Sequence, residues 1–455
     1  MTKGQKKQLN VVYFICHDIG TELGCYGKPL ATPHLDKFAE NGICFTNVFA
    51  NSTACSPSRG CAMTGKYAHV NGQTGLAHMG HPLPENQKTI VDYLNTSGYE
   101  TVHCGFSHER GAGRNHYQID LEKADNNIDD YDAKNAVEQA ICYLERKANS
   151  GRPFYLNIGT ADTHISRWLW TWEERDFGKQ IPPESVYVPL YIADTAENRN
   201  ALSKFQTSLS YLDAHFGRLY TALDRLGYLE NTIIIFTTDH GISNRRSKGT
   251  LYDRGVEVSL LLRAPQVQNN RRCACLLQNI DFAPTILEAC GISIPDDMQG
   301  KSFWPLINGK EYRPHQYIFT ERNFHGERIH KKERNINVFE GYAKKEKNEI
   351  SLDIYDPIRA VRSEKYHYIR YFKPDLKQLP VIPPDVLGID ENLYKECTVN
   401  SIEQPQKRCA EELFAIEQDP LELVNLAKRS EYNNIKNHLS GILDEWMQKT
   451  NDCIK

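Results

Sequence analysis

Residues 10–20, NVVYFICHDIG, decide how this chain is expected to fold. The six apolar residues VVYFIC match a buried β-strand, and the polar pair His17 and Asp18 follows them at once. Further apolar runs recur along the chain, and the longer segments between them have helical periodicity. That alternation is typical of a mostly parallel sheet covered by helices. The runs are VVYFIC, TVHCGF from 101, PFYLNIGT from 153, TIIIFTT from 232 and VSLLLRAP from 258.

Five helices are predicted between these strands. After about residue 310 the sequence has more polar segments and fewer periodic ones. Two long loops are expected at 322–353 and 373–408. The segments IRAVRSEKYHYIRYF and EELFAIEQDP match strands of a smaller antiparallel sheet, followed by a helix at 430–448. We therefore predict a large α/β domain over 1–312 and a smaller subdomain over 313–455. The predicted helices span 33–41, 89–96, 132–148, 197–227 and 281–290.

The composition excludes several classes of function. The formal net charge of the 455 residues is −4, which gives no general attraction to nucleic acid or to membranes. No segment reaches the ~18 apolar residues of a membrane span, and the N-terminal apolar run is too short for a signal peptide. Thirteen cysteines without a CxxC pair predict free thiols in a reducing, cytoplasmic location. A signal removed during maturation would leave the same sequence, and the oligomeric state stays open.

Polar and ionisable residues follow four of the predicted strands. Ligands of an open α/β sheet bind beyond the carboxyl ends of its strands, so these residues are expected at one edge of the sheet. Two carboxylates with a histidine beside each could bind a divalent cation. The residues are His17 and Asp18 after VVYFIC, His108 after TVHCGF, Asp162 and His164 after PFYLNIGT, and Asp239 and His240 after TIIIFTT.

A plainer interpretation exists for both aspartates. Asp18 and Asp239 each stand two residues before a glycine, Gly20 and Gly241, and Asp-x-Gly is a common turn sequence. Either aspartate alone is therefore better explained as a turn or cap residue. The metal interpretation gains weight because both follow strands of the same predicted sheet.

The segment ACSPSRGCAMTGKY, residues 54–67, concentrates two cysteines, a proline and an arginine. With Pro57 in the first turn of a helix, Cys55 would lie at the helix N-terminus, where N–H groups favour an anion and lower the pKa of a thiol. Arg59, one turn along, could hold an oxyanion or an acidic group on residue 55. A buried, inert thiol is the competing interpretation for Cys55. Cys61 occupies an apolar position in the periodic pattern of the segment and is predicted to be a core residue.

The stretch CSPSRGCAMTGK resembles the signature of the formylglycine-dependent sulfatases, in which Cys-x-Pro-x-Arg is followed by Thr-Gly and a basic residue. NVVYFICHDIG resembles the first metal strand of that family and IIIFTTDHG the second, while KGTLYDRGVEVSLLLRAP and ELFAIEQDPLELVNLA resemble later segments. The resemblance spans nearly the whole chain. It implies an alkaline-phosphatase-like α/β fold, with a mostly parallel sheet between helices and a small C-terminal antiparallel sheet plus helix. The catalytic domain would be 1–312, and 313–455 would complete the substrate pocket.

The resemblance implies that Cys55 is the precursor of the nucleophile. A formylglycine-generating enzyme that recognises Cys55, Pro57 and Arg59 would oxidise it to formylglycine (3-oxoalanine), whose hydrated aldehyde would attack sulfur. A divalent cation, calcium in this family, would bind the sulfate oxygens and lower the pKa of the nucleophile. Its predicted ligands are Asp18, Asp239, His240, Cys55 and His17.

Other residues take roles around that centre by the same resemblance. Arg59 and Lys248 would stabilise the charge of the transferring group. His108 would assist at the formylglycine, and His164 would protonate the leaving atom or bind sulfate. Without the resemblance, a solvated loop lysine would explain Lys248 equally well. The predicted substrate contacts are Asp162 and Arg110.

Two positions depart from the family pattern. His17 stands where the family usually has an aspartate, so that an imidazole replaces a carboxylate near the metal. Phe106 stands where the family usually has a lysine that contacts sulfate, and losing that cation removes a donor worth ~3 kcal/mol in the transition state. Arg110 or His108 is the predicted replacement.

Within that family, the sequence most resembles the N-sulfoglucosamine sulfohydrolases, or sulfamidases. The segments TADTHISRW and EWMQKTNDC carry this resemblance. This implies a sulfated saccharide of glycosaminoglycan origin as substrate, cleaved at an N-sulfate or an O-sulfate. Residues 165–195 and 322–353 are expected to set specificity. Two alternatives stay open. One is a phosphodiesterase or phosphonate monoester hydrolase on the same scaffold, and the other is a non-catalytic sugar-binding relative.

Overall fold

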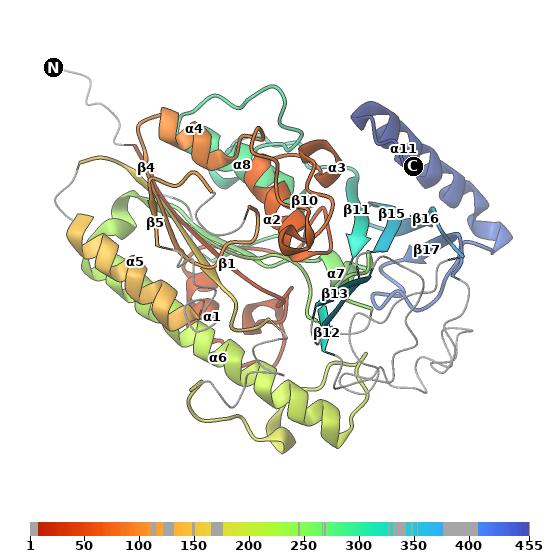
Figure 1. The fold of residues 1–455 in the computed structure, drawn as a ribbon, viewed down its shortest axis with the longest axis horizontal. Coiled ribbons are helices and arrows are strands. Elements are labelled where there is room, and N and C mark those ends of the chain that lie inside the picture. Colours follow the sequence, from red (N-terminus) through yellow and green to blue (C-terminus); the bar gives the residue numbers. More distant parts are fainter. Residues whose placement is uncertain are drawn as a thin grey trace.

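The centre of the fold is a sheet that, within the described residues, has eight strands in the order β5-β4-β6-β1-β7-β8-β2-β9 (Figure 1). They are β1 (Asn10–Cys16), β2 (Ile43–Phe45), β4 (Glu100–Gly105), β5 (Ile119–Asp120), β6 (Phe154–Thr160), β7 (Thr232–Thr238), β8 (Leu260–Arg263) and β9 (Arg271–Cys273). The structure is a computed structural model that describes residues 8–110, 115–121, 132–147, 151–164, 176–243, 246–265, 267, 270–325, 328–330, 343–346, 349–352, 354–375 and 408–454.

Strand β1 lies in the middle of this sheet. It is buried along its whole length and pairs in parallel with β6 on one side and β7 on the other. β8 runs antiparallel to both of its neighbours, β7 and β2, whereas the remaining neighbours are parallel. The predicted mostly parallel sheet is therefore confirmed, and of the five apolar runs only VSLLLRAP runs against the others.

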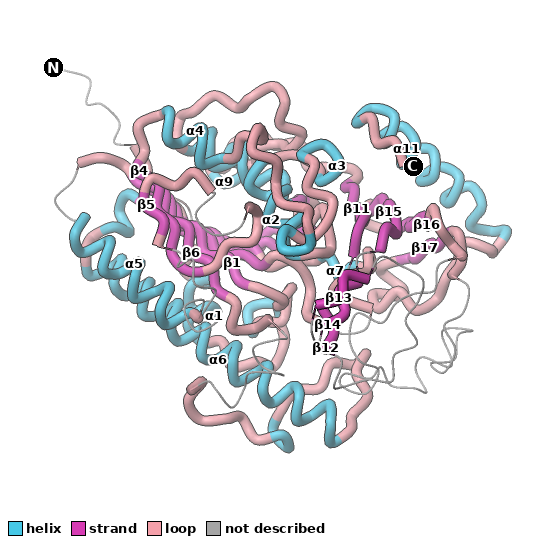
Figure 2. The backbone as a smooth tube through the Cα atoms, viewed as in Figure 1, coloured by secondary structure: helices cyan, strands magenta, loops and turns pink. Residues whose placement is uncertain are grey.

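Helices cover both faces of the sheet (Figures 1 and 2). One face carries α1 (Pro33–Glu40), α5 (Ala133–Lys147) and α6 (Ala196–Arg225). The other face carries α2 (Cys55–Thr64), α4 (Ile90–Thr96) and α8 (Phe282–Ala289). Alternate residues of β1 enter the two apolar clusters: Phe14 packs on Phe216 of α6, while Ile15 belongs to the cluster with α2, α4 and α8. The five predicted helices are all present, each ending within two residues of its predicted bounds.

A smaller antiparallel sheet lies beside the central one, as predicted for the C-terminal part of the chain. Its strands are β11 (Ile318–His325), β15 (Ile354–Arg362), β16 (Tyr366–Tyr371) and β17 (Glu411–Ala415). Helix α11 (Asn433–Thr450) lies beside this sheet (Figure 1). The ring of Trp446 on the helix stacks on Phe319 of β11, with 4.8 Å between the ring centroids. The boundary expected between residues 312 and 313 stays a prediction.

The prediction of a loop over 322–353 is wrong in part. β11 continues to His325, and three short strands form a sheet of their own: β12 (Arg328–His330), β13 (Ala343–Glu346) and β14 (Glu349–Leu352). Backbone hydrogen bonds between strands do not require an apolar pattern, which is why the polar sequence concealed them. Of the other predicted loop, 376–407 lies outside the described residues.

The chain turns sharply where β1 and β7 end, and the two turns contact each other. Asp18 adopts the left-handed conformation with φ of 52°, which is uncommon for a residue with a side chain. Gly20 is also left-handed, and a Cβ on it would lie 3.1 Å from the Cα of Gly241. The N–H of Gly20 donates to the carbonyl of His240 at 2.9 Å. Asp18 and Asp239 do lie in turns, and those turns bring their carboxylates together.

Gly159 in β6 is a position where a methyl group should disrupt the same edge of the sheet. It pairs with Gly105 of β4, and a Cβ on it would lie 1.8 Å from the carbonyl oxygen of Phe106. Because that neighbour is backbone, we expect Gly159→Ala to lower the free energy of unfolding by about 3 kcal/mol. Gly441→Ala in α11 is the control: it meets no described atom within 4 Å and should stabilise by about 1 kcal/mol. Chemical denaturation measures both, and effects of the same sign would contradict the prediction.

Two further findings concern the described residues as a whole. No helix in this part of the chain has the length and apolarity needed to cross a bilayer. Twelve of the thirteen cysteines are described, and all twelve are free thiols. Cys61 is fully buried in an apolar cluster shared with the C-terminal sheet and α11, so its prediction as a core residue is confirmed.

Candidate active site

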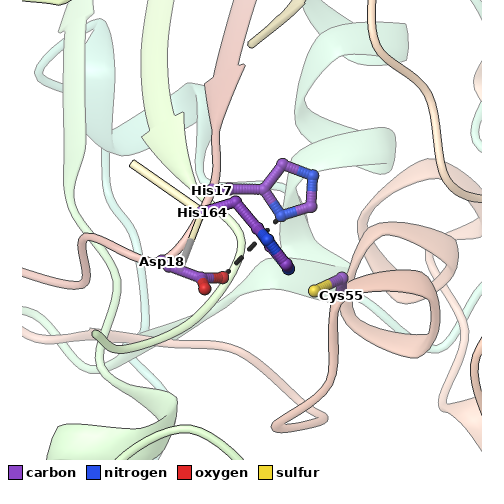
Figure 3. A group of neighbouring side chains, drawn as sticks. All are labelled: His17, Asp18, Cys55 and His164. Carbon is purple, nitrogen blue, oxygen red and sulfur yellow. Dashed lines mark ion pairs between the residues drawn. The ribbon is translucent and has the colours of Figure 1, made fainter. Parts of the chain in front are cut away.

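The carboxyl-end edge of the central sheet meets the start of α2 and gathers most of the predicted site residues. Figure 3 shows four of them converging, with the Cys55 side chain facing the residues that follow β1. Lys248 reaches the same place from the loop before α7 (Asp253–Val256). The residues at this edge are His17 and Asp18 after β1, Asp239 and His240 after β7, His108 after β4, His164 after β6, Cys55 and Arg59 on α2, and Lys248.

Asp18 and Asp239 form the acidic centre of the site. Both are buried, and the N–H of Asp18 donates to Oδ1 of Asp239 at 3.1 Å. Lys248 Nζ lies 2.9 and 3.1 Å from the two oxygens of Asp18, and Arg59 Nε donates to Oδ2 of Asp239 at 3.1 Å. Burial raises the pKa of both carboxyl groups, but these cations and the surrounding imidazoles hold each pKa below its usual value. Both side chains therefore carry a negative charge.

The orientation of His240 is set by the backbone carbonyl of the next residue, Gly241. Its Nδ1 lies 2.9 Å from the carbonyl oxygen of Gly241, so Nδ1 carries the proton and donates to that oxygen. Nε2 then faces Cys55 Sγ at 3.1 Å and Asp18 Oδ1 at 3.4 Å. Burial lowers the pKa of His240, but the nearby carboxylates and Cys55 raise it to about 9. The pocket thus attracts a cation, and a metal would displace a proton from Nε2.

Cys55 begins helix α2, as the sequence predicts for a reactive thiol. The residue is only 2% exposed. Burial raises the pKa of its thiol, but Lys248, His240, His17 and His108 together hold that pKa well below its usual value. Inert core thiols lie in apolar surroundings, whereas Cys55 Sγ lies 3.1 Å from His240 Nε2 within a group of carboxylates and imidazoles.

Arg59 lies one turn after Cys55, and its guanidinium is 1% exposed. Nε contacts Asp239, while the buried Nη2 has no hydrogen-bond partner among the described residues. The guanidinium carbon lies 5.7 Å from the centre of the Phe106 ring. A buried N–H group of an arginine is costly to leave without an acceptor. Nη2 is therefore available to an oxyanion bound at the end of the helix.

Lys248 connects Asp18 to His164. Its Nζ lies 3.3 Å from Nε2 of His164, in addition to its two contacts with Asp18. Burial and the charge of Lys248 lower the pKa of His164. Lys248 is 4% exposed, so its interpretation as a solvated loop residue is wrong.

His17 faces both carboxylates. Its Nδ1 lies 2.9 Å from Asp239 Oδ2 and 3.8 Å from Asp18 Oδ1. The ring packs against Phe106 and His164, with centroid distances of 4.8 and 5.3 Å. Burial lowers the pKa of His17, but Asp239 raises it to about 10. Phe106 thus forms an apolar wall beside His17 and Arg59, at the position where a lysine was expected from the family pattern.

Sequence reasoning missed two residues of this site. His78 lies in the short helix Ala77–Met79, and its ring stacks on His108 at 5.2 Å with Nδ1 3.0 Å from His108 Nε2. It follows no strand, so only the histidine-rich sequence AHMGH hinted at it. Ser243 donates from Oγ to Oδ2 of Asp18. Its one signal was its position four residues after Asp239.

Asp162 and Arg110, the predicted substrate contacts, both make hydrogen bonds within the protein. Asp162 is buried and accepts the N–H of Ala133 with both oxygens, at 3.0 and 3.2 Å, so it caps the start of α5. Arg110 donates to the carbonyl oxygens of Pro84 and Gln87. These contacts give each side chain a structural task. Substrate contact by either residue, and the replacement of the missing cation at Phe106 by Arg110, stay predictions.

Comparison with known proteins agrees with this geometry. The model of the sulfatase family matches residues 9–292 of the chain. An ulvan-active sulfatase of Formosa agariphila is 27% identical over 466 residues, covering 98% of this chain and 81% of its own. The human N-sulphoglucosamine sulphohydrolase is 27% identical over 336 residues, covering 66% of each chain.

A solved structure shows the same fold. It is a protein in complex with its substrate D-glucosamine-2-N,6-O-disulfate. The two structures agree with a TM-score of 0.69 over 98% of this chain and 99% of the other, at 17% sequence identity. The large sheet, the smaller C-terminal sheet and their relation to the helices are therefore shared with that protein.

Proposed function

The chain belongs to the sulfatase family, and we propose on that premise that it hydrolyses the sulfate ester or sulfamate of a sugar, with a nucleophile made from Cys55. One observation carries the proposal. Cys55 lies at a buried helix N-terminus, 3.1 Å from His240, beside two carboxylates and an arginine N–H that lacks an acceptor. A thiol in a structural core does not need such neighbours.

The donor atoms around Cys55 fit a divalent cation. Single donor atoms of Asp18, Asp239, His240 and Cys55 all lie within 4.8 Å of one another, and Cys55 Sγ marks the place of the formylglycine oxygens. A cation bound there would hold sulfate oxygens and lower the pKa of the nucleophile. The family resemblance implies Ca²⁺ in this role.

Residue 55 needs a maturation partner. A formylglycine there supplies a hydrated aldehyde, in which one oxygen attacks sulfur and the other re-forms the aldehyde as sulfate leaves. Cys55, Pro57 and Arg59, the expected recognition signal, are all buried in the folded protein. A modifying enzyme would therefore have to act before α2 packs against the sheet.

We assign each remaining residue of the site a role in the reaction through a specific atom. Arg59 Nη2 binds an oxygen of the transferring sulfate and stabilises its charge. Lys248 Nζ and His164 Nε2, 3.3 Å apart, share a proton that can pass to the leaving atom of the sugar. His108, held by His78 at 3.0 Å, moves a proton at residue 55. Phe106 packs on His17 and helps to exclude water from this side.

The substrate class follows from relatives rather than from this geometry. The relatives are named for ulvan and for N-sulphoglucosamine, and the solved structure holds a sulfated glucosamine. We propose a sulfated saccharide, with N-sulfated glucosamine as the first candidate. Of the segments expected to set specificity, 165–175 and parts of 322–353 lie outside the described residues.

Parallel turnover of nitrophenyl sulfate and nitrophenyl phosphate by the mature enzyme tests the reaction class. We expect the sulfate ester to be turned over faster than the phosphate ester. A sulfate ester carries one negative charge, which the cationic groups at the site can balance, whereas the phosphate ester carries a second negative charge. Preference for the phosphate or for a phosphonate would favour the alternative hydrolase. An unmodified Cys55 in the native host, with no turnover of any ester, would favour a non-catalytic sugar-binding protein.

A panel of sulfated mono- and disaccharides tests the substrate. The released sulfate is quantified and its position on the sugar is assigned from the product. Release from the N-sulfate of glucosamine is the expected result. Release from O-sulfates alone would contradict the sulfamidase assignment while keeping the sulfatase one.

A further inference from the structure

We propose that Glu422 and His367, two buried residues of the C-terminal part of the chain, are positioning residues that hold Lys248 in place for the reaction. The proposal rests on the proposed function, because the role of Lys248 is assigned there. Neither residue belongs to the site described above. Their effect on it follows from a continuous series of hydrogen bonds that connects the C-terminal sheet to the loop of Lys248.

The loop that carries Lys248 is folded against α7. Ser247 Oγ donates to the carbonyl oxygen of Arg254 at 2.7 Å. Gly255 lies so close to the loop that a Cβ on it would be 2.4 Å from the carbonyl oxygens of Ser247 and Thr250. Because Ser247 directly precedes Lys248, the position of the lysine depends on where α7 lies.

Glu422 holds α7 and the loop at the same time. Its Oε2 accepts the N–H of Asp253, the first residue of α7, at 2.6 Å. Its backbone carbonyl accepts from Arg246 Nη2, and the neighbouring carbonyl of Leu421 accepts from Arg254 Nη2 at 2.7 Å. The loop and α7 are therefore bound at both ends to the same two consecutive residues.

His367 fixes Glu422 from the side of the C-terminal sheet. His367 lies on β16, and its Nδ1 is 2.6 Å from Glu422 Oε1 and 3.4 Å from Asp253 Oδ1. Glu422 has a left-handed backbone with φ of 54°, which a residue with a side chain adopts only where its surroundings hold it. Both oxygens of this buried carboxylate are thus bound, and its position is set by a strand of the smaller sheet.

The far end of this series is the reacting centre. Lys248 Nζ lies 2.9 Å from Asp18 Oδ2 and 3.3 Å from His164 Nε2. A misplacement of about 1 Å at such a group can cost about 10²-fold in rate. The loop also has a second support, since the N–H of Gly249 donates to Thr53 Oγ1 at 2.9 Å. Loss of Glu422 should therefore displace the lysine without releasing the whole loop.

Hydrogen exchange followed by mass spectrometry tests the support of the loop without any assay of turnover. In Glu422→Ala, the backbone amides of residues 246–256 should exchange at least about ten-fold faster than in the wild-type protein. Glu417→Ala, at an exposed position of the same segment, should leave this exchange unchanged. Leu443→Ala, in the core beneath α11, should lower the unfolding temperature without affecting these amides. Wild-type exchange in Glu422→Ala would overturn the proposal.

Kinetics of the mature enzyme tests whether Glu422 acts through Lys248. Glu422→Ala should lower kcat by about ten-fold and leave KM within about two-fold of its wild-type value. Added to Lys248→Met, it should change kcat by less than about two-fold, because the group that it positions is already gone. A purely structural role would instead give losses that multiply, and that result would overturn the proposal.

Two further variants keep the test informative. Glu422→Gln retains an oxygen that can accept the N–H of Asp253, so it should keep more activity than Glu422→Ala. If Glu422→Ala does not fold, His367→Ala removes the partner of the carboxylate and takes its place in the exchange and kinetic measurements.

The outcomes separate this proposal from the proposed function. Faster exchange of the loop in Glu422→Ala, in a protein that releases no sulfate, would support the support of the loop by Glu422 and count against the hydrolase. Sulfate release by the wild-type enzyme, with unchanged exchange and kcat in Glu422→Ala, would support the hydrolase and overturn the positioning role.

Discussion

Cys55→Ala should lose turnover of sulfated sugars by about 10⁴-fold or more, while the protein keeps its fold. The variant cannot be converted to formylglycine, so no group at the start of α2 can form the covalent intermediate. The ionisable groups that lie beside residue 55 are carboxylates and imidazoles, and none of them is a thiol that could take its place. Released sulfate measures the activity, and thermal unfolding followed by circular dichroism measures the fold.

Cys61→Ala is the matched control, since the same helix carries both cysteines. Cys61 is fully buried among apolar side chains and the C-terminal sheet. Its truncation should lower the free energy of unfolding by about 1 kcal/mol and leave kcat near the wild-type value. The peptide mass of each protein shows whether residue 55 has been oxidised. Substantial turnover by Cys55→Ala would refute the nucleophile, and loss of turnover in folded, oxidised Cys61→Ala would refute the separation of the two cysteines.

Lys248→Met should lower kcat by about 10²- to 10³-fold, the second largest effect that we expect. The lysine contacts Asp18 at 2.9 Å and His164 at 3.3 Å, so its loss removes a cation from both the metal ligand and the leaving-group side. Methionine keeps the length of the apolar stem and removes only the charge. Lys37→Met on α1, where the side chain is 69% exposed, should leave kcat unchanged.

The same variant should alter the pH dependence. Burial and Lys248 lower the pKa of His164, so removing the lysine raises that pKa. His164 then keeps its proton to higher pH, and the residual activity should decline at a higher pH than in the wild-type enzyme. A loss of less than ten-fold in kcat, or an unchanged profile, would contradict the role given to the pair Lys248 and His164.

Much of the fold could be predicted because its signals are local. The apolar runs placed β1, β4, β6 and β7, and helical periodicity placed the five helices within two residues. The failures have physical reasons as well. β8 is antiparallel, which an apolar run does not reveal, and β12, β13 and β14 are held by backbone hydrogen bonds that leave no apolar pattern.

The candidate site could also be predicted in part. Residues that follow parallel strands converge at one edge, so His17, Asp18, Asp239 and His240 were found from spacing alone. His78 and Ser243 were missed because neither directly follows a strand. His78 reaches His108 only because the segment that carries it packs beside α2, where the N–H of Ala77 donates to Ser56 at 3.0 Å.

The sequence by itself determined the α/β architecture, the helix that begins at Cys55 and the pair of aspartates at strand ends, because each depends on residues close together in the chain. Only the tertiary structure decided what each side chain does. Asp162 and His164 follow the same strand, yet Asp162 turns inward to cap α5 while His164 faces Lys248. The direction of the Asp162 side chain depends on Ala133, which is 29 residues away in the chain, and that of His164 depends on the loop of Lys248, which is 84 residues away. Packing between distant segments sets such directions, and local sequence does not carry them.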